Sequence, residues 1–146
     1  MSKRESLSLE ETHHIRDSCL CLHMQRAARV VARRFDDALR PLGLTNGQFS
    51  LLVSLNRPGA ASMSAVAALL AVDRTTLTAN LKPLERRGLL KVAVDKNDRR
   101  NRTITLSAKG RALVKLAYPI WEQTHAAQEE LLKTPDRLRS ELLALS

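Results

Sequence analysis

Residues 9–39 contain neither proline nor glycine, and apolar side chains recur along them at steps of three and four. The clearest run is Leu20, Met24, Ala27, Val31, Phe35 and Leu39. This periodicity predicts one amphipathic helix, and about 30 residues at about 1.5 Å each make it about 45 Å long. A chain of 146 residues builds one modest core, which is too small to cover so long a helix. We therefore expect part of the apolar stripe to contact a second chain or a distant segment.

Three shorter helices are predicted after this one, each with a recognisable start. Thr45 and Gln48 have the spacing of a capping box, and Ser62 and Asp73 can cap the second and third helices. Gly88 stands where the third helix should end, because glycine readily adopts the left-handed conformation needed there. The second and third helices are joined by a tight turn, which is typical of a helix-turn-helix.

Two runs of β-forming residues follow, at 89–94 and 102–106, on either side of a polar tip. They predict a β-hairpin, or wing, attached to the helix-turn-helix. A long helix is then expected from Ser107, followed by a terminal helix with Thr134 as its cap and Pro135 at its first position.

The predicted fold class is mainly α with a small β-hairpin wing. We divide the chain into an N-terminal dimerisation helix (residues 1–44), a winged helix-turn-helix module (45–110) and C-terminal dimerisation helices (111–146). The three parts together are expected to form one domain, because no long linker or low-complexity segment separates them.

The formal net charge is +9 and the sequence pI is about 10.4, which makes a polyanion the first partner to consider. Residues 73–111 hold eleven Lys and Arg against four Asp and Glu, a net charge of +7, whereas residues 1–72 carry +3 and residues 112–146 carry −1. A charge cluster is often only a solvated surface, so the local structure must decide its role. Four aromatic residues are too few for the stacking platforms of single-strand and RNA binders, which favours duplex DNA.

Arg74 and Asn80 of the third short helix have side chains that pair bidentately with guanine and adenine in a major groove. The candidate DNA contacts on that helix are Arg74, Thr75, Thr76, Thr78, Asn80 and Lys82, and those on the wing are Asp98, Arg99 and Arg100. The threonines can meet phosphate or a thymine methyl group, and a wing arginine can enter a minor groove while Asp98 holds one guanidinium. The alternative is ordinary polar surface, and attachment to a helix-turn-helix argues against it.

Five segments carry a resemblance to a known family: LTNGQF at 44–49, DRTTLT at 73–78, LERRGL at 84–89, DRR at 98–100 and LSAKG at 106–110. They resemble the winged helix-turn-helix of the MarR family of bacterial transcription regulators. The resemblance implies a homodimer on a palindromic operator, with one recognition helix in each major groove and Arg100 of each wing in the minor groove. It also implies a small phenolic or aromatic effector between the helical arms and the winged module. The function we expect is a repressor released by that effector.

A thiol-based peroxide sensor is an alternative, because Cys21 matches the place of the reactive cysteine in the hydroperoxide-sensing branch of that family. Tyrosines that hydrogen-bond the thiolate in that branch are replaced here by Phe35 and Asn46. A further interpretation is that Cys19 and Cys21 are small buried helix residues. For an organic effector, the candidate partners of a carboxylate or phenol are Arg16, His23 and Arg26.

Possible metal ligands also crowd into eleven residues of the first helix, namely His13, His14, Cys19, Cys21 and His23. Cys19 and His23 have the i, i+4 spacing that puts two ligands on one helix face. Two ligands do not make a metal site, so we expect no metal and no other cofactor.

Features that the chain lacks argue against several other classes of protein. The longest uninterrupted apolar stretch, residues 65–72, is too short to span a membrane, and no signal-peptide sequence opens the chain, so we expect a cytoplasmic protein without membrane contact. Two cysteines two positions apart give no disulfide framework. No carboxylate pair, nucleophile–base arrangement or glycine-rich phosphate loop is present, so we do not expect an enzyme. A non-specific architectural DNA binder would be equally basic and is kept as an alternative.

Overall fold

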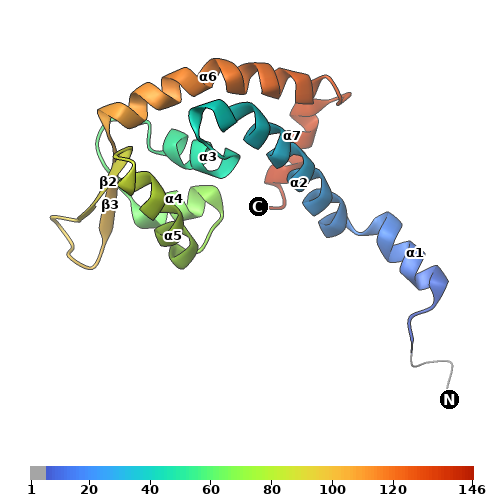
Figure 1. Cartoon of the computed structure of the whole chain (residues 1–146). Coiled ribbons are helices and arrows are strands. Elements are labelled where there is room, and N and C mark those ends of the chain that lie inside the picture. The colour runs from blue at the N-terminus through green and yellow to red at the C-terminus, as the bar shows by residue number, and fades with distance from the viewer. Residues whose placement is uncertain (1–5) are drawn as a thin grey trace.

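The computed structural model describes residues 6–146 and is mainly helical, with one small antiparallel sheet. In chain order the elements are α1 (Leu9–Ser18), α2 (Leu20–Leu39), the 3₁₀ helix η1 (Arg40–Leu42), α3 (Asn46–Ser54), β1 (Ala61–Ser62), α4 (Met63–Leu70), α5 (Arg74–Arg86), β2 (Leu90–Val94), β3 (Arg102–Leu106), α6 (Ala108–Glu129) and α7 (Pro135–Leu143). Figure 1 shows α6 running above α2 and α3, with α4 and α5 below α3 and the sheet at the left of the view. The predicted fold class is confirmed. We call α1, α2, α6 and α7 the arms, and α3 to β3 the winged module.

The N-terminal arm consists of two helices, so the prediction of one continuous helix over residues 9–39 is wrong. Cys19 separates α1 from α2, because its backbone is extended (φ −67°, ψ 109°). Its carbonyl oxygen lies 2.7 Å from Nδ1 of His23. Residues 17–19 are Asp, Ser and Cys, which are weak helix formers, and no side chain of α1 is buried. Neither intrinsic propensity nor packing therefore holds this junction in a helical conformation.

The wing is a β-hairpin at the predicted place, and it pairs with a third strand that the sequence analysis missed. β2 and β3 are antiparallel, with Leu90 opposite Leu106. β1 pairs with β3 through Ala61 opposite Ile104, which gives the strand order β1-β3-β2. A strand of two residues has no alternating pattern of its own, because only its partner defines it.

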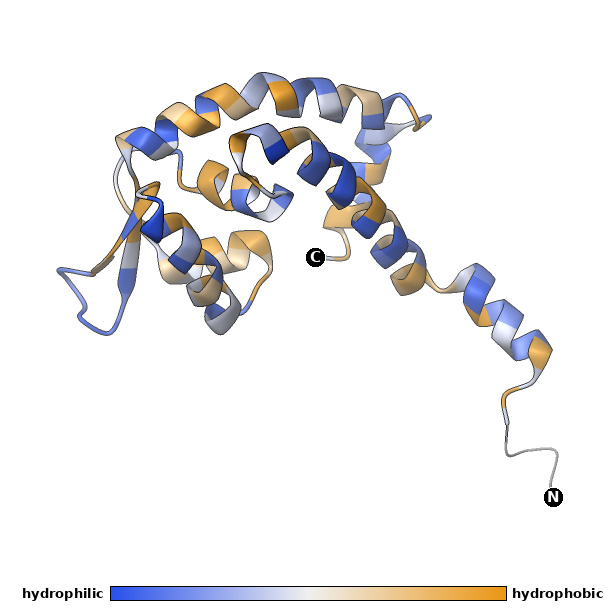
Figure 2. Cartoon of the chain, in the orientation of Figure 1, coloured by the Kyte–Doolittle hydropathy of each residue, from blue (hydrophilic) through white to orange (hydrophobic). Residues whose placement is uncertain are grey.

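The hydrophobic core lies inside the winged module. Apart from Leu39 of α2 and Ala117 of α6, the buried apolar side chains belong to residues 44–106. α1 and α7 bury no residue, and Figure 2 shows hydrophobic positions along both helices. Apolar surface on the arms is thus left outside the core of the single chain. Within residues 6–146, no helix is both long and apolar enough to cross a membrane.

Most predicted helix starts are confirmed. Thr45, Ser62 and Asp73 each accept a hydrogen bond from the backbone N–H three residues later, and Gly88 has the expected left-handed φ of +71°. Thr134 is the N-cap residue of α7 and Pro135 its first helical residue, as predicted, but the Thr134 side chain makes no capping hydrogen bond. Its backbone (φ −141°, ψ 70°) departs from the extended geometry that directs a capping side chain at the first helical turn.

Candidate nucleic-acid interface

Helix α5 has one face in the core and the other in solvent. Leu77, Leu81 and Leu84 are buried, which fixes the rotation of α5 about its axis. Oδ1 of Asp73 accepts a hydrogen bond of 2.7 Å from the Thr76 backbone N–H, and this bond is the main cause of the lowered pKa of the Asp73 carboxyl group. The carboxylate also lies favourably at the positive end of the helix dipole. The exposed face of α5 is therefore presented in a defined orientation.

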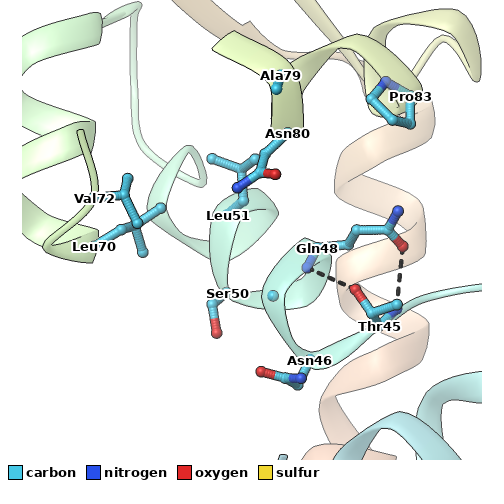
Figure 3. Close-up of a pocket in the computed structure, with 11 residues that line it drawn as sticks. Thr45, Asn46, Gln48, Ser50, Leu51, Leu70, Val72, Ala79, Asn80 and Pro83 are labelled. Carbon is cyan, nitrogen blue, oxygen red and sulfur yellow. Dashed lines mark hydrogen bonds between the residues drawn. The ribbon is translucent and has the colours of Figure 1, made fainter. Parts of the chain in front are cut away.

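The predicted DNA contacts on α5 are exposed but do not share one face. They are Arg74, Thr75, Thr76, Thr78, Asn80 and Lys82. At about 100° per residue, Thr75 and Lys82 lie opposite the buried leucines. Thr78 lies on the flank nearer the wing, where its hydroxyl donates a hydrogen bond of 2.8 Å to the Arg74 carbonyl oxygen. Asn80 lies on the other flank, where Figure 3 shows its side chain descending toward α3.

The tip of the wing holds Arg99 and Arg100 in solvent. Oδ1 of Asp98 accepts a hydrogen bond of 3.0 Å from the Arg100 backbone N–H, and Oδ2 lies 3.4 Å from the side-chain amide of Asn101. Aspartate shapes many tight turns through such bonds to the main chain. Asp98 therefore stabilises the turn itself, rather than holding a guanidinium as we expected from the sequence.

Two charged residues near the end of α5 attach it to its surroundings, and the sequence analysis missed both. Oε2 of Glu85 accepts a hydrogen bond of 2.8 Å from the Val92 backbone N–H in β2. The Arg87 guanidinium donates to the carbonyl oxygens of Gly43 at 2.7 Å and Leu42 at 3.4 Å. These partners lie 7 to 45 residues away, so the local charge pattern gives no sign of them.

A cavity of about 280 Å³ lies between α2, α3 and α6, and we call it the arm cavity. Its walls are mostly apolar and include Val31, Phe35 and Trp121, and its polar lining groups are Asn46 and Ser50. This composition suits a small ligand with an aromatic ring and one or two polar substituents.

Asn46, at the start of α3, is held by Asp36 of α2. Oδ1 of Asp36 accepts hydrogen bonds from the Asn46 backbone N–H at 2.6 Å and from its side-chain Nδ2 at 2.8 Å. The backbone bond is the main cause of the lowered pKa of the Asp36 carboxyl group. The first turn of α3 is thus attached to the N-terminal arm.

A second cavity of about 450 Å³ lies between α3 and α5, and we call it the α3–α5 cavity. Asn46 and Ser50 line both cavities, so α3 forms the wall between them. Asn80 of α5 lines the α3–α5 cavity but not the arm cavity. A ligand in the arm cavity would therefore touch α3, which also lines the cavity beside α5.

A model of the MarR family matches residues 44–101, which cover the helix-turn-helix and most of the wing. The solved structure of the transcriptional regulator MosR of M. tuberculosis, in complex with DNA, is 40% identical to this chain with a TM-score of 0.81. The match covers 88% of this chain and 93% of that chain. This chain belongs to the MarR family.

Two further relatives agree with this membership. BpsR of Bordetella bronchiseptica, whose DNA binding is regulated by 6-hydroxynicotinic acid, is 30% identical, with a TM-score of 0.72 over 86% of this chain and 95% of that chain. The transcriptional activatory protein BadR of Rhodopseudomonas palustris is 33% identical over 95 residues, which are 63% of this chain and 54% of BadR. The chain spans about half the length of the curated relatives it matches. It is a MarR-family transcription regulator, and the family is one of regulators rather than enzymes.

The predicted effector contacts of this MarR-family chain come together, but away from the arm cavity. Arg16, His23 and Arg26 surround a cavity of about 100 Å³ beside Leu22. The positions of His23 and Arg26 on α2 place this cavity on the opposite side of that helix from the arm cavity. The Arg16 guanidinium lies 2.6 Å from Asp17, and this contact raises the pKa of Arg16.

Neither cysteine of this MarR-family chain is buried in the single chain. Cys21 is exposed, with its Sγ 3.4 Å from Nε2 of Gln25, and Cys19 is half-buried at the junction of α1 and α2. The interpretation of both as small buried residues therefore does not hold for one chain. Within residues 6–146, no group of three or more His, Cys, Asp or Glu side chains is arranged to hold a metal ion.

Proposed function

We propose that this regulator is a repressor that binds a palindromic operator as a homodimer and is released by a small aromatic or phenolic effector. The observation that carries the proposal is the exposed face of α5 beside an exposed, arginine-bearing wing tip, in a segment of net charge +7. A winged helix-turn-helix places these elements against the major and minor grooves. The proposed DNA contacts are Arg74, Thr75, Thr76, Thr78, Asn80, Lys82, Arg99 and Arg100, and Asp98 is proposed to hold the turn that carries the two wing arginines.

The arms support the homodimer. α1 and α7 bury no residue in the single chain, and Leu9, Leu20 and Leu143 are 67–73% exposed. Large apolar side chains exposed on helices outside the core favour contact with another chain. A twofold axis would bring equivalent arms together and direct two α5 helices at the two half-sites of a palindrome.

The arm cavity supports the response to an effector. Phe35 and Trp121 suit an aromatic ring, and Asn46 and Ser50 can hydrogen-bond a phenolic hydroxyl group. BpsR responds to a hydroxylated aromatic acid, which is a ligand of this chemical class. Because α3 separates the arm cavity from α5, displacement of α3 by a ligand would change the orientation of the recognition helix.

As an alternative effector site on the other side of α2, we propose the cavity that Arg16, His23 and Arg26 surround, where they would attract the carboxylate of an effector. An aromatic acid is expected to lose affinity in Arg26→Ala, whereas the corresponding neutral amide should not. Equal affinity of the acid for the variant and the native chain would place its carboxylate elsewhere.

Peroxide sensing through Cys21 is the second candidate function, because the thiol is exposed and an oxidant can reach it. Hydrogen peroxide would then lower operator affinity in the native chain but not in Cys21→Ser. Loss of affinity that survives the substitution would remove Cys21 from the mechanism.

The DNA-binding proposal is tested by footprinting the full chain on the region upstream of its own gene. We expect a protected palindrome whose half-sites lie about 10 base pairs apart, and a mass of two chains in solution. Affinity for that site should exceed affinity for unrelated DNA by about 10³-fold or more. Equal affinity for both DNAs would favour the architectural binder.

Base readout is tested separately with Arg74→Ala. Loss of a bidentate contact should relax base preference at one position of each half-site, by about 1–3 kcal/mol. Lys115→Ala on α6 is the matched control, because it removes one exposed positive charge outside the winged module. An unchanged base preference in Arg74→Ala would contradict the assigned role of Arg74.

The effector is sought by a thermal-shift screen of aromatic acids, phenols and acyl thioesters. A true effector should raise the melting temperature and lower operator affinity. Ala28→Phe fills the arm cavity from an exposed position of α2, and Ala27→Phe adds the same ring at an exposed position outside that cavity. Unchanged effector affinity in Ala28→Phe would place the effector site elsewhere.

A further inference from the structure

The basic segment with the net charge of +7 also contains four carboxylate groups, and carboxylates repel the phosphates of DNA. Each of the four accepts a hydrogen bond from a backbone N–H group. Asp73, Asp95 and Asp98 accept from residues two or three positions ahead, and so shape their own helix start or turn. Glu85 differs from them, because it belongs to α5 and accepts from Val92 in β2. Its carboxylate therefore joins the recognition helix to the wing.

Val92 presents its N–H group at an edge of the sheet. The strand order is β1-β3-β2, so β2 pairs with β3 on one side, and within the described residues no strand pairs with its other side. Oε2 of Glu85 lies 2.8 Å from the Val92 nitrogen and accepts the hydrogen bond that a further strand would accept. Such bonds lie in the plane of a sheet. The Glu85–Val92 bond thus holds β2 to α5 in that plane.

Apolar packing holds the hairpin in a different direction. Side chains stand roughly perpendicular to a sheet, and Leu90, Ile104 and Leu106 are buried together on one face of the hairpin. Their burial resists movement of the hairpin away from the core. It resists much less a tilt of the hairpin within its own plane, toward α5 or away from it. The Glu85–Val92 bond opposes this tilt directly.

Beyond Val92 the hairpin leaves the core, and Figure 1 shows its tip projecting at the left of the view. Val94 is 48% exposed, and Arg99 and Arg100 at the tip are exposed as well. Within the described residues, the hydrogen bonds of the tip join tip residues only to one another. The position of the tip relative to α5 is therefore set where the hairpin leaves the core.

We propose that Glu85 is a positioning residue that sets the distance between the recognition helix and the tip of the wing. Its bond to Val92 holds the hairpin at the tilt at which Arg99 and Arg100 reach a minor groove while α5 lies in the neighbouring major groove. This role rests on the proposed function. Glu85 acts through the wing arginines and does not itself touch DNA.

Charge alone predicts the opposite behaviour, which separates the two explanations. Removal of a carboxylate near DNA should strengthen binding whatever replaces it. Glu85→Gln and Glu85→Met remove the same charge and keep a similar length, but only glutamine keeps an oxygen that can accept from the Val92 N–H group. We expect Glu85→Gln to bind the operator at least as tightly as the native chain. Glu85→Met should bind about fivefold more weakly or worse.

Fluorescence anisotropy on the palindrome found by footprinting measures these affinities at several salt concentrations. Glu85→Met should lower the slope of log affinity against log salt concentration by about one, since a wing arginine loses its contact. When Arg99→Ala and Arg100→Ala are already present, Glu85→Met should weaken binding by less than about twofold. When Arg74→Ala is present instead, the fivefold loss should remain, because Arg74 belongs to the major-groove contact.

The hydrogen bond itself is measured on the full chain without DNA, by amide hydrogen exchange. The Val92 N–H group should exchange slowly in the native chain and in Glu85→Gln, and about tenfold faster or more in Glu85→Met. The amide of Leu81, in the middle of α5, should exchange equally in all three chains, which shows that the recognition helix is intact.

Equal operator affinity in Glu85→Gln and Glu85→Met would overturn the proposal. So would a loss in Glu85→Met that is just as large without the wing arginines, or an equal exchange rate of the Val92 N–H group in the three chains. Failure of the native chain to bind any palindrome would instead overturn the proposed function, and the exchange rates would still show whether Glu85 holds the wing.

Discussion

The guanidinium of Arg87, just after α5, donates a hydrogen bond of 2.7 Å to the carbonyl oxygen of Gly43, at the turn that follows α2. Gly43 has a left-handed φ of +65°, and a Cβ atom there would lie 3.3 Å from Nη2 of Arg87. Lys109 of α6 adds a hydrogen bond of 2.9 Å to the Arg87 carbonyl oxygen. The end of the recognition helix is thus attached to both the N-terminal and the C-terminal arm.

Arg87→Met should loosen this attachment while keeping the aliphatic part of the side chain. We expect a loss of about 1–2 kcal/mol in the free energy of unfolding, measured in urea. Operator affinity should fall roughly fivefold, since that factor corresponds to about 1 kcal/mol. Arg87→Lys should recover part of the affinity, because one ammonium group can reach one of the two carbonyl oxygens. Arg86→Met is the control for stability, and an equal loss in both variants would contradict the role of Arg87.

Arg100→Ala should weaken operator binding and reduce its dependence on salt. Each cation that meets the DNA backbone releases a counterion, so the slope of log affinity against log salt concentration should fall by about one. The measurement is anisotropy at several salt concentrations. Lys115→Ala removes the same charge from α6 and should leave the slope nearly unchanged. The same slope in Arg100→Ala and the native chain would exclude Arg100 from the interface.

Gly110→Ala should destabilise the protein strongly, because the new Cβ atom would lie 2.1 Å from the Leu89 carbonyl oxygen and 2.7 Å from Cδ1 of Leu106. Backbone must move to relieve the first contact, at a cost of about 3 kcal/mol. Gly47→Ala makes the same chemical change in open space and should be neutral or stabilising by up to about 1 kcal/mol. Urea unfolding of both variants compares them, and equal stability would show that α6 does not approach Leu89 and β3 this closely.

Asp36 should make stability depend on pH in the acid range. The hydrogen bonds from Asn46 hold the folded-state pKa of its carboxyl group below the ordinary value of about 3.9. A lowered folded-state pKa adds stability above that ordinary value, and this contribution is lost as pH falls through the folded-state pKa. The stability difference between the native chain and Asp36→Asn should therefore shrink between pH 7 and pH 3 in urea unfolding.

Asp37→Asn is the matched control for that measurement. Asp37 pairs with Arg40 on the surface, where an ion pair contributes little to folding. The stability difference between the native chain and this variant should be small at both pH values. An equal pH dependence in the two variants would show that the Asp36–Asn46 hydrogen bonds do not control it.

The sequence was sufficient for features whose interacting groups lie close together along the chain. The caps Thr45 and Asp73 bond N–H groups three residues ahead, and the hairpin forms around its own tip, so the pattern of a few residues predicts them. The same holds for the charge of residues 73–111, which is a property of composition. Together with the resemblance of the quoted segments, these local signals were enough for the winged helix-turn-helix and its expected partner.

The tertiary structure decided what depends on residues far apart in the chain. The strand β1, the bond from Arg87 to Gly43 and the cavity that Asn80 lines have no local signature, because each is set by packing against another element. The break at Cys19 lies where such packing is missing, since α1 buries no residue. The arm cavity and the α3–α5 cavity also depend on tertiary packing, because each lies between helices that are separated in the sequence. Local hydrogen bonds determine which segments become helices and strands. Burial of apolar surface in the folded chain then determines which side chains remain exposed to bind DNA and ligands.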